Sequence, residues 1–180
     1  MKKHILAFGA SSSKQSINKQ FAAYAASLLK EVEVNLIDLN DFEMPLFSVD
    51  RETGHGVPEA AFRFKELIKS VDGIILSLAE HNSAYSAAYK NIYDWTSRIE
   101  QEFWYNKPLL LLSTSPGPRG GKNVMEIAKK AYGRINKNLV AGFSLPSFYA
   151  NFEAESGITN EELKLELLKL IDQFNIKIQE

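Results

Sequence analysis

Cysteine is missing from this chain of 180 residues, and its absence removes several kinds of chemistry at once. Without a thiol there is no disulfide, no thiolate nucleophile, no cysteine-ligated zinc and no iron–sulfur cluster. We see no other metal-binding pattern. A chain without cysteine suits a reducing compartment, so we expect a cytoplasmic protein.

Long apolar runs and a charge excess of either sign are lacking as well. No run approaches the roughly 18 apolar residues of a membrane span, and no signal-peptide core follows the first residues. The formal net charge is −1, whereas nucleic-acid-binding surfaces are basic and small electron carriers are acidic, to dock basic partners. We therefore expect neither a membrane nor a nucleic acid as a partner.

Alternating strand and helix patterns run through the whole chain, and its length suits one domain over residues 1–180. Residues 40–57 are expected to form an irregular surface loop. Pro58 suits the first turn of its helix, and Thr159 with Glu162 suits a capping box. Short apolar runs predict strands at residues 4–8, 33–38, 73–79, 108–114 and 139–145, and helical patterns predict helices at 16–30, 58–70, 84–99, 123–136 and 160–175.

Five strand–helix units predict an α/β fold with a doubly wound parallel sheet and right-handed crossovers. Such sheets bind ligands beyond the carboxyl ends of their strands. The loops that follow the first, third and fourth expected strands, at residues 11–18, 79–83 and 113–121, are therefore the places to look for chemistry.

The loop at residues 11–18 is rich in hydroxyl groups and leads directly into a helix. It holds four serines, at positions 11–13 and 16, together with Lys14 and Asn18. Backbone N–H groups and the dipole at a helix start favour an anion, and one serine would suffice for capping alone. The spacing fits neither a Walker loop nor a dinucleotide fingerprint, so it favours the phosphate of FMN over ATP.

The other two loops are less specific. Asn82 can offer both a donor and an acceptor to a heterocycle, Glu80 is either a base or a solvated charge, and His81 has no catalytic partner visible in the sequence. Glycines in the segment 113–121 allow close approach to a flat ligand, or simply a flexible connection. Arg119 either holds a second phosphate or lies in solvent.

The tyrosines at positions 85, 89 and 93 share one helical stripe. Such a stripe is typical of core packing. It is wider than one sheet face needs, so part of it could form a dimer interface, where aromatic residues are enriched.

With these loops in view, the chain resembles the NADPH-dependent FMN reductase family of the flavodoxin-like fold. The family's opening motif G-S-x-R-x-x-S-x-N aligns with Ala10–Asn18. The motif P-E-Y-N-x-S-x-P-x-x-L-K-N-x-x-D-W aligns with Ala79–Trp95, whose specific ending is Lys90, Asn91, Asp94 and Trp95. The motif K-P, then a strand and S-x-G-x-x-G-G, aligns with Lys107, Pro108 and Ser115–Gly121.

The resemblance implies a three-layer α/β/α fold with a five-stranded parallel sheet in the order 2-1-3-4-5. It also implies FMN as cofactor and NAD(P)H as hydride donor. Hydride would pass to flavin N5 and electrons then to a small acceptor such as a flavin or a quinone, with no catalytic side chain and no metal. Members of the family are commonly homodimers or homotetramers.

The resemblance further assigns cofactor-binding residues to the three loops. One group would hold the FMN phosphate: Ser11, Ser13, Ser16, Ile17 and Asn18. A second would line the edge of the isoalloxazine ring: Glu80, His81 and Asn82. A third would cover its other side: Thr114, Ser115, Gly117 and Gly120.

Two departures from the family pattern concern the site. The family's loop arginine is Ser13 in this chain, and the adjacent Lys14 is expected to compensate as a further cofactor-binding residue. Tyr85 and Ser86 stand where the family has a small residue and a proline, so a bulky Tyr85 would narrow the pocket and alter substrate preference.

Three other functions deserve comparison with a reductase. A non-enzymatic, flavodoxin-like electron carrier is the main alternative, although the net charge argues against it. A hydrolase would need Ser144, whose surrounding pattern lacks the last glycine of a nucleophile elbow and falls inside the fifth expected strand. A phospho-acceptor receiver domain would need an aspartate at the end of the third strand, where Ser77, Leu78 and Ala79 stand.

Overall fold

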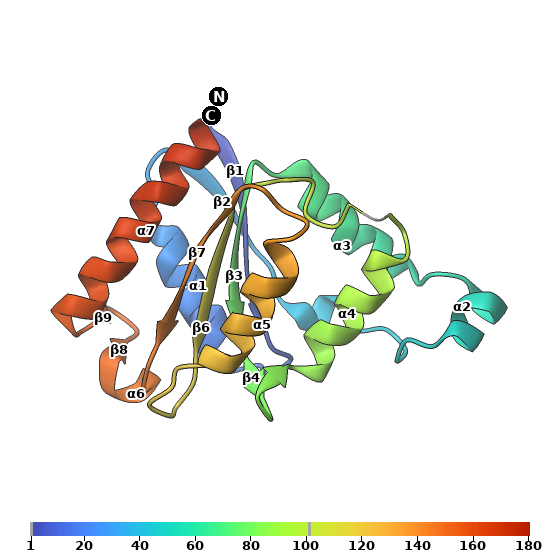
Figure 1. Cartoon of the computed structure of the whole chain (residues 1–180), viewed down its shortest axis with the longest axis horizontal. Helices are drawn as coiled ribbons and strands as arrows, with labels where there is room; N and C mark the ends of the chain where they lie inside the picture. Colours follow the sequence, from blue (N-terminus) through green and yellow to red (C-terminus); the bar gives the residue numbers. More distant parts are fainter. Residues whose placement is uncertain (1, 101) are drawn as a thin grey trace.

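A parallel sheet forms the centre of the molecule, with helices on both of its faces (Figure 1). The computed structural model describes residues 2–100 and 102–180. The five strands are hydrogen-bonded in the order β2-β1-β3-β6-β7. They are β1 (Lys3–Ala10), β2 (Val32–Leu36), β3 (Gly73–Leu78), β6 (Leu109–Thr114) and β7 (Leu139–Leu145). This is the predicted order 2-1-3-4-5, so the flavodoxin-like, doubly wound fold is confirmed.

The strands in the middle of the sheet, β1, β3 and β6, are apolar and almost entirely buried because both faces are covered there, whereas the edge strand β2 is mostly exposed. In β1, Leu6 and Phe8 belong to one apolar cluster with α3 (Glu59–Ser70), α4 (Ala87–Ser97) and α5 (Lys122–Tyr132). Ile5 and Ala7 belong to a second cluster with α1 (Ile17–Ser27) and α7 (Glu161–Gln179). Alternate side chains of a strand point to opposite faces, so one strand contributes to both cores.

All five expected helix starts differ from the structure, four of them by one residue. The helix expected from residue 84 begins at Ala87, because β4 (Glu80–His81) and β5 (Ala84–Tyr85) form an antiparallel hairpin first. Pro58 is the N-cap of α3 and lies just before its first turn. Asn160 caps α7 in place of Thr159, since the Asn160 side chain accepts a hydrogen bond from the Leu163 N–H at 3.1 Å.

The expected irregular loop at residues 40–57 contains two short helices. A 3-10 helix, η1 (Leu39–Phe42), opens it, and α2 (Val49–His55) follows. Ser48 caps α2. None of the residues of α2 is buried, so the sequence shows no apolar periodicity that would predict this helix. In Figure 1, α2 projects away from the sheet.

The residues that end the second family motif, at positions 90–95, hold the segment before α2 in place. The Asn91 side chain accepts a hydrogen bond from the Phe47 N–H at 2.8 Å. The Trp95 Nε1–H donates to the Pro45 carbonyl at 2.6 Å, and Lys90 pairs with Asp94 on the same helix. Helix α4 therefore anchors the start of the projecting segment.

The tyrosine stripe is largely core, as predicted. Tyr89 is completely buried, and its hydroxyl lies 2.6 Å from that of Tyr132 on α5. Burial raises the pKa of both phenols well above the ordinary value. Tyr85 and Tyr93 are half-buried.

Three short elements after β7 were not predicted: α6 (Phe148–Asn151), β8 (Phe152–Glu153) and β9 (Gly157–Ile158). Elements of two to four residues are too short to show a period. In the part of the chain that the structure describes, no helix has both the length and the apolar character needed to cross a bilayer.

Candidate functional site

A cavity of about 290 Å³ lies where the carboxyl ends of β1, β3 and β6 meet. Its walls come from the three loops singled out in the sequence and from one residue of α6. The lining residues are Ser11, Ser13, Gln15, Ser16, Ile17, Asn18, Ala79, Glu80, His81, Thr114, Ser115, Pro116 and Tyr149. Loops far apart in the sequence thus form one site, at the place where doubly wound sheets bind ligands.

The start of α1 offers free hydrogen-bond donors to this cavity. Gly9 lets the helix approach β1 closely, because a Cβ there would lie 2.3 Å from the Lys19 nitrogen. Ser16 caps the helix by accepting from the Lys19 N–H at 3.1 Å. The N–H groups of Ile17 and Asn18 have no acceptor among residues 2–100 and 102–180. These two donors and the positive end of the helix dipole suit an anion.

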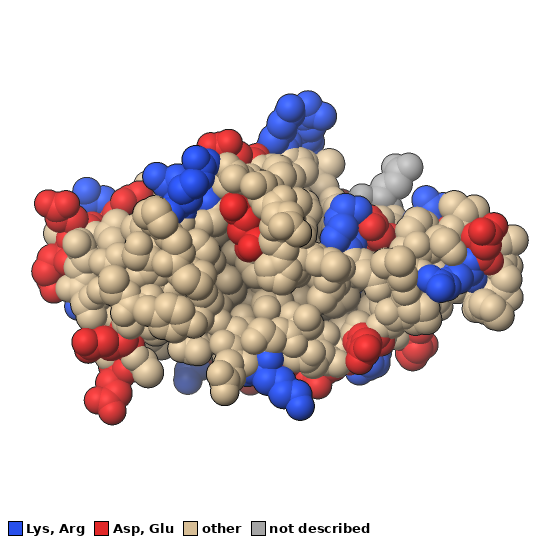
Figure 2. Space-filling model, turned by 90° about the horizontal axis from the view of Figure 1, so that it is seen from below, with Lys and Arg blue, Asp and Glu red and all other residues tan. Residues whose placement is uncertain are grey.

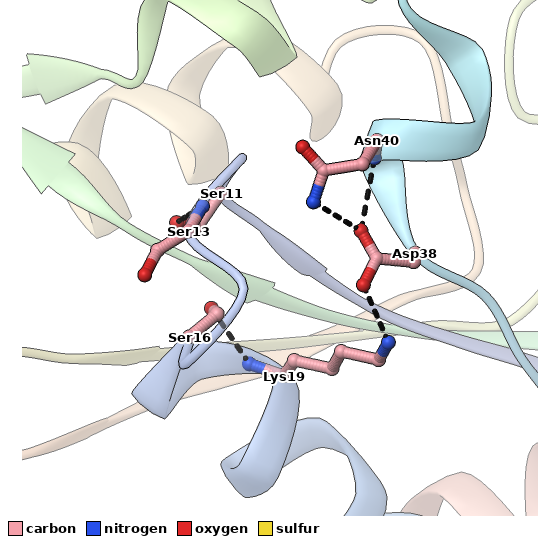
Figure 3. A network of polar contacts seen from close by, with 6 residues as sticks. All are labelled: Ser11, Ser13, Ser16, Lys19, Asp38 and Asn40. Atoms are coloured by element: carbon pink, nitrogen blue, oxygen red, sulfur yellow. Dashed lines mark hydrogen bonds and ion pairs between the residues drawn. The ribbon is translucent and has the colours of Figure 1, made fainter.

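Two serine hydroxyls of the loop are also available as donors (Figure 3). The Ser11 Oγ accepts from the Ser13 N–H at 3.1 Å, and the Ser16 Oγ accepts from Lys19. Each oxygen is used as an acceptor, which leaves its O–H hydrogen free to donate. Hydroxyl and N–H donors that converge on one helix start form a site suited to phosphate.

The half-buried cation on the first turn of α1, Lys19, is already paired with an acid. The Lys19 Nζ lies 2.6 Å from the Asp38 Oδ2, and Asn40 donates twice to the other carboxylate oxygen (Figure 3). The hydrogen bond from Lys19, followed by that from the Asn40 N–H, lowers the pKa of Asp38. Lys14 is exposed and is not part of the cavity wall. Figure 2 views the molecule from the side of β4 and α6, and much of that face is uncharged.

The Asn18 side chain holds the loops of the site together. Its Oδ1 accepts from the Ser77 hydroxyl at 2.7 Å and from the Thr114 N–H at 3.1 Å. Its Nδ2 donates to the Thr114 carbonyl at 3.2 Å. All three residues are buried. The amide therefore joins α1 to β3 and β6, and its main role in this structure is to position the phosphate loop and the Thr114 loop together.

The β4–β5 hairpin brings Glu80 and His81 to the cavity and turns away at its tip. Asn82 and Ser83 both have positive φ, at 50° and 63°, as the two-residue turn of such a hairpin requires. Asn82 therefore shapes the turn and lies outside the cavity wall. The Glu80 carboxylate accepts from the Val124 N–H at 3.0 Å, in the first turn of α5. The N-cap of α5 is Gly121, which has no side chain to cap the helix, so the Glu80 carboxylate supplies a cap instead.

Gly117 and Gly120 also lie outside the cavity wall and give the third loop its shape. Gly120 has φ of +59°, and a Cβ there would lie 2.5 Å from the Leu145 carbonyl oxygen. The Gly117 carbonyl accepts from the Ser147 N–H at 2.9 Å. Thr114 bonds through its hydroxyl to the Leu145 carbonyl at 2.9 Å. The segment is thus tied to the end of β7, and Thr114 and Ser115 face the cavity.

Ser144 does not have the surroundings of a hydrolase nucleophile. It lies inside β7, where its hydroxyl is 2.8 Å from that of Ser113. The Ser113 hydroxyl in turn donates to the Gly120 carbonyl at 2.8 Å. This pair of hydroxyls links β6 to β7 and belongs to the framework below the site.

A sequence model of the family described as NADPH-dependent FMN reductase matches residues 3–149 of the chain. The chain belongs to this family. It is an NAD(P)H-dependent oxidoreductase with FMN as its cofactor.

Similar proteins cover nearly the whole length of this reductase. An NADPH:quinone oxidoreductase from Arabidopsis thaliana is 29% identical over 189 residues, which cover 97% of this chain and 93% of the relative. A quinone reductase from Pseudomonas putida is 27% identical over 167 residues, which cover 89% of this chain and 87% of the relative. The solved structure of FerB, a flavoenzyme NAD(P)H:(acceptor) oxidoreductase from Paracoccus denitrificans, has a TM-score of 0.76 at 23% identity. The match covers 98% of this chain and 97% of FerB. That structural similarity shows the shared fold.

The donor set in the reductase fits FMN. A phosphate dianion accepts hydrogen bonds only, and the loop at residues 11–18 presents free O–H and N–H groups. Nine of the thirteen residues expected at the cofactor line the cavity; Lys14, Asn82, Gly117 and Gly120 do not. Sequence reasoning missed Gln15, Ala79, Pro116 and Tyr149. The first three adjoin predicted residues, whereas Tyr149 follows the fifth strand, whose carboxyl end reaches the same edge of the sheet.

Proposed function

We propose that this reductase passes electrons from NAD(P)H through FMN to a small quinone-type acceptor, and that the cavity described above is the FMN site. The observation that carries the assignment of the site is the convergence of free donors, two N–H and two O–H groups, at the start of α1. The names of the two curated relatives support a quinone as the class of acceptor.

The protein's own residues bind and orient in this scheme. Ser11, Ser16 and the N–H groups of Ile17 and Asn18 hold the phosphate. Residues 79–81 form one wall for the ring system and residues 114–116 another. When bound, FMN supplies the chemistry, since it takes two electrons from a nicotinamide and gives them to an acceptor. No side chain needs to act as a nucleophile. If donor and acceptor took turns at the same bound flavin, the kinetics would be ping-pong, which is what we expect.

An anaerobic reduction experiment tests this function. The purified protein is loaded with FMN, excess flavin is removed, and NADPH or NADH is added while the visible flavin band is followed. We expect rapid bleaching, and recovery of the band when one equivalent of a benzoquinone is added. Retained flavin that neither nucleotide bleaches would instead fit the electron carrier.

A pair of serine variants tests the placement of the phosphate. Ser11 lines the cavity, whereas its neighbour Ser12 lines a different one between η1 and α4. Ser11→Ala should raise the Kd for FMN about tenfold, the effect of losing one hydrogen bond to a charged group. Ser12→Ala should leave it unchanged. Riboflavin, which has no phosphate, should bind both variants like the wild type. Equal weakening of FMN by both substitutions would place the phosphate elsewhere.

We further propose that residues 1–180 act as one FMN-binding domain, which assembles as a homodimer or homotetramer in the cytoplasm. One sheet shared by both apolar clusters supports a single domain. Light scattering on the purified holoprotein measures the assembly directly, and a monomer at micromolar concentration would contradict the second part of the proposal.

A further inference from the structure

Tyr149 is exposed at the wall of the cavity, although it is aromatic. It is the second residue of α6, and 74% of its surface is accessible, more than for any other large apolar side chain in the described part of the chain. Among the lining residues of the cavity it is the only Phe, Tyr or Trp; the other ring is the smaller imidazole of His81. A single exposed aromatic ring beside a binding cavity is a candidate contact for a ligand.

The backbone that carries Tyr149 is held firmly against the site. The Ser147 N–H donates to the Gly117 carbonyl at 2.9 Å, and the Phe148 N–H donates to the Ser115 carbonyl at 3.0 Å. Ser147 itself adopts a left-handed conformation, with φ of 45° and ψ of 60°. Backbone strain in a residue other than glycine persists where the surroundings enforce it, and often marks a functional site.

The neighbouring side chain explains why the Tyr149 ring cannot turn into the core. Phe148 occupies the inward position: it is 3% exposed and stacks on Phe152 with ring centroids 4.6 Å apart. The Tyr149 ring meets the Phe148 ring edge-on at 5.5 Å. The ring is therefore presented at the rim of the cavity, where α6 lies beside the ends of β6 and β7 (Figure 1).

We propose that Tyr149 is a flavin-binding residue, which packs its ring against the bound flavin and acts through the ring rather than through its hydroxyl group. This rests on the proposed FMN site. The other apolar side chains of the wall, Ile17, Ala79 and Pro116, are not aromatic. A flat conjugated ligand would cover the exposed tyrosine, and stacking with an aromatic side chain adds to the gain from burial.

Flavin titrations of two variants separate the ring from the hydroxyl group. Tyr149→Ala should raise the Kd for both FMN and riboflavin about tenfold, the size typical of losing one aromatic stacking partner. Tyr149→Phe should bind both flavins within about twofold of the wild type, since it keeps the ring. Bound flavin should also fluoresce more strongly in Tyr149→Ala, because a stacked phenol no longer quenches it. Phe62→Ala, an exposed aromatic of α3 that lines another cavity, is the matched control.

Each other outcome overturns the proposal in a recognisable way. If Tyr149→Phe weakens FMN but not riboflavin, the hydroxyl binds the phosphate and the stacking role is wrong. If Tyr149→Ala binds both flavins like the wild type, Tyr149 does not touch the flavin, while the FMN site itself stands. If the wild type binds no FMN, the proposed function fails together with this inference. Melting curves of the flavin-free variants should match the wild type, because the side chain is exposed.

Discussion

Single residues in this site serve the framework more often than the sequence suggests. Asn18 is expected at the phosphate, but its side-chain amide forms hydrogen bonds with Ser77 and Thr114 instead. Glu80 caps a helix, and Asn82 makes a turn. Hydroxyl and amide groups are useful both for binding an anion and for satisfying buried backbone groups, so residue type alone does not separate the two roles.

The two glycines of the third loop should respond differently to a side chain. Gly120→Ala places a Cβ 2.5 Å from the Leu145 carbonyl oxygen at a φ of +59°, whereas a Cβ at Gly117 meets only the Ser115 Oγ, at 3.9 Å. We expect Gly120→Ala to lower the free energy of unfolding by about 1–3 kcal/mol. Gly117→Ala should change it by less than about 0.5 kcal/mol. Urea denaturation measures both, and equal effects would show that the loop relaxes around Gly120.

At the scale of elements, contacts between a loop and a helix end position the site. The hairpin docks on α5 through Glu80, and the start of η1, just after β2, is tied to α1 through Asp38 and Lys19. The elements involved are short, and each such contact joins segments that are distant in the sequence. Their loss should therefore weaken the site before it unfolds the sheet.

Removal of the Glu80 carboxylate should destabilise α5 at its first turn. Glu80→Ala leaves the Val124 N–H without its acceptor and takes a negative charge from the positive end of the helix dipole. We expect a loss of about 1 kcal/mol in unfolding free energy, the usual value of an N-cap. Glu126→Ala, at an exposed position of the same helix, is the control. Thermal denaturation followed by circular dichroism compares them, and identical melting temperatures would rule out the capping role.

The Asp38–Lys19 pair should make stability depend on pH in the acid range. The lowered pKa of Asp38 in the folded state means that its contribution is present at neutral pH. The contribution declines below about pH 4, where an unfolded aspartate titrates, and vanishes below the folded pKa. Asp38→Asn should therefore be less stable than the wild type at pH 7, by about 1 kcal/mol, with the difference shrinking toward pH 2.

Lys19→Met tests the same pair from the other side. It removes the cation that contributes most to the lowered pKa. The double variant should be hardly less stable than either single variant, since each already loses the pair. Additive losses, or a difference from the wild type that does not change with pH, would contradict this account.

At the scale of the whole molecule, the fold was predictable and its small additions were not. Short apolar runs predicted all five strands, and the family resemblance predicted their order. The hairpin, α2 and α6 are too short or too exposed to leave a pattern. Their omission had a consequence for the site: Tyr149 lies on α6 and was missed, whereas residues at the ends of the predicted strands were found.

FMN should stabilise the molecule as a whole, because the folded sheet is required to assemble its site. A free concentration 100 times the Kd should add about 2.7 kcal/mol to the free energy of unfolding. The melting temperature should rise with FMN concentration, in a single transition if the chain is one domain. The shift should be smaller in Ser11→Ala at the same concentration. A melting temperature independent of FMN would mean that the folded protein does not bind it.

The Asn18 amide also imposes an order of events in time. A growing chain emerges with its N-terminus first, and the phosphate loop is among its earliest residues. The partner that fixes this loop, Thr114, follows 96 residues later, and contacts of such long sequence separation form late in folding. In a nascent chain from which β6 has not yet emerged, the serines of the phosphate loop would not be held in the arrangement that binds phosphate. We therefore expect cofactor capture to follow the synthesis of β6, so that FMN does not act as a template for the first half of the fold.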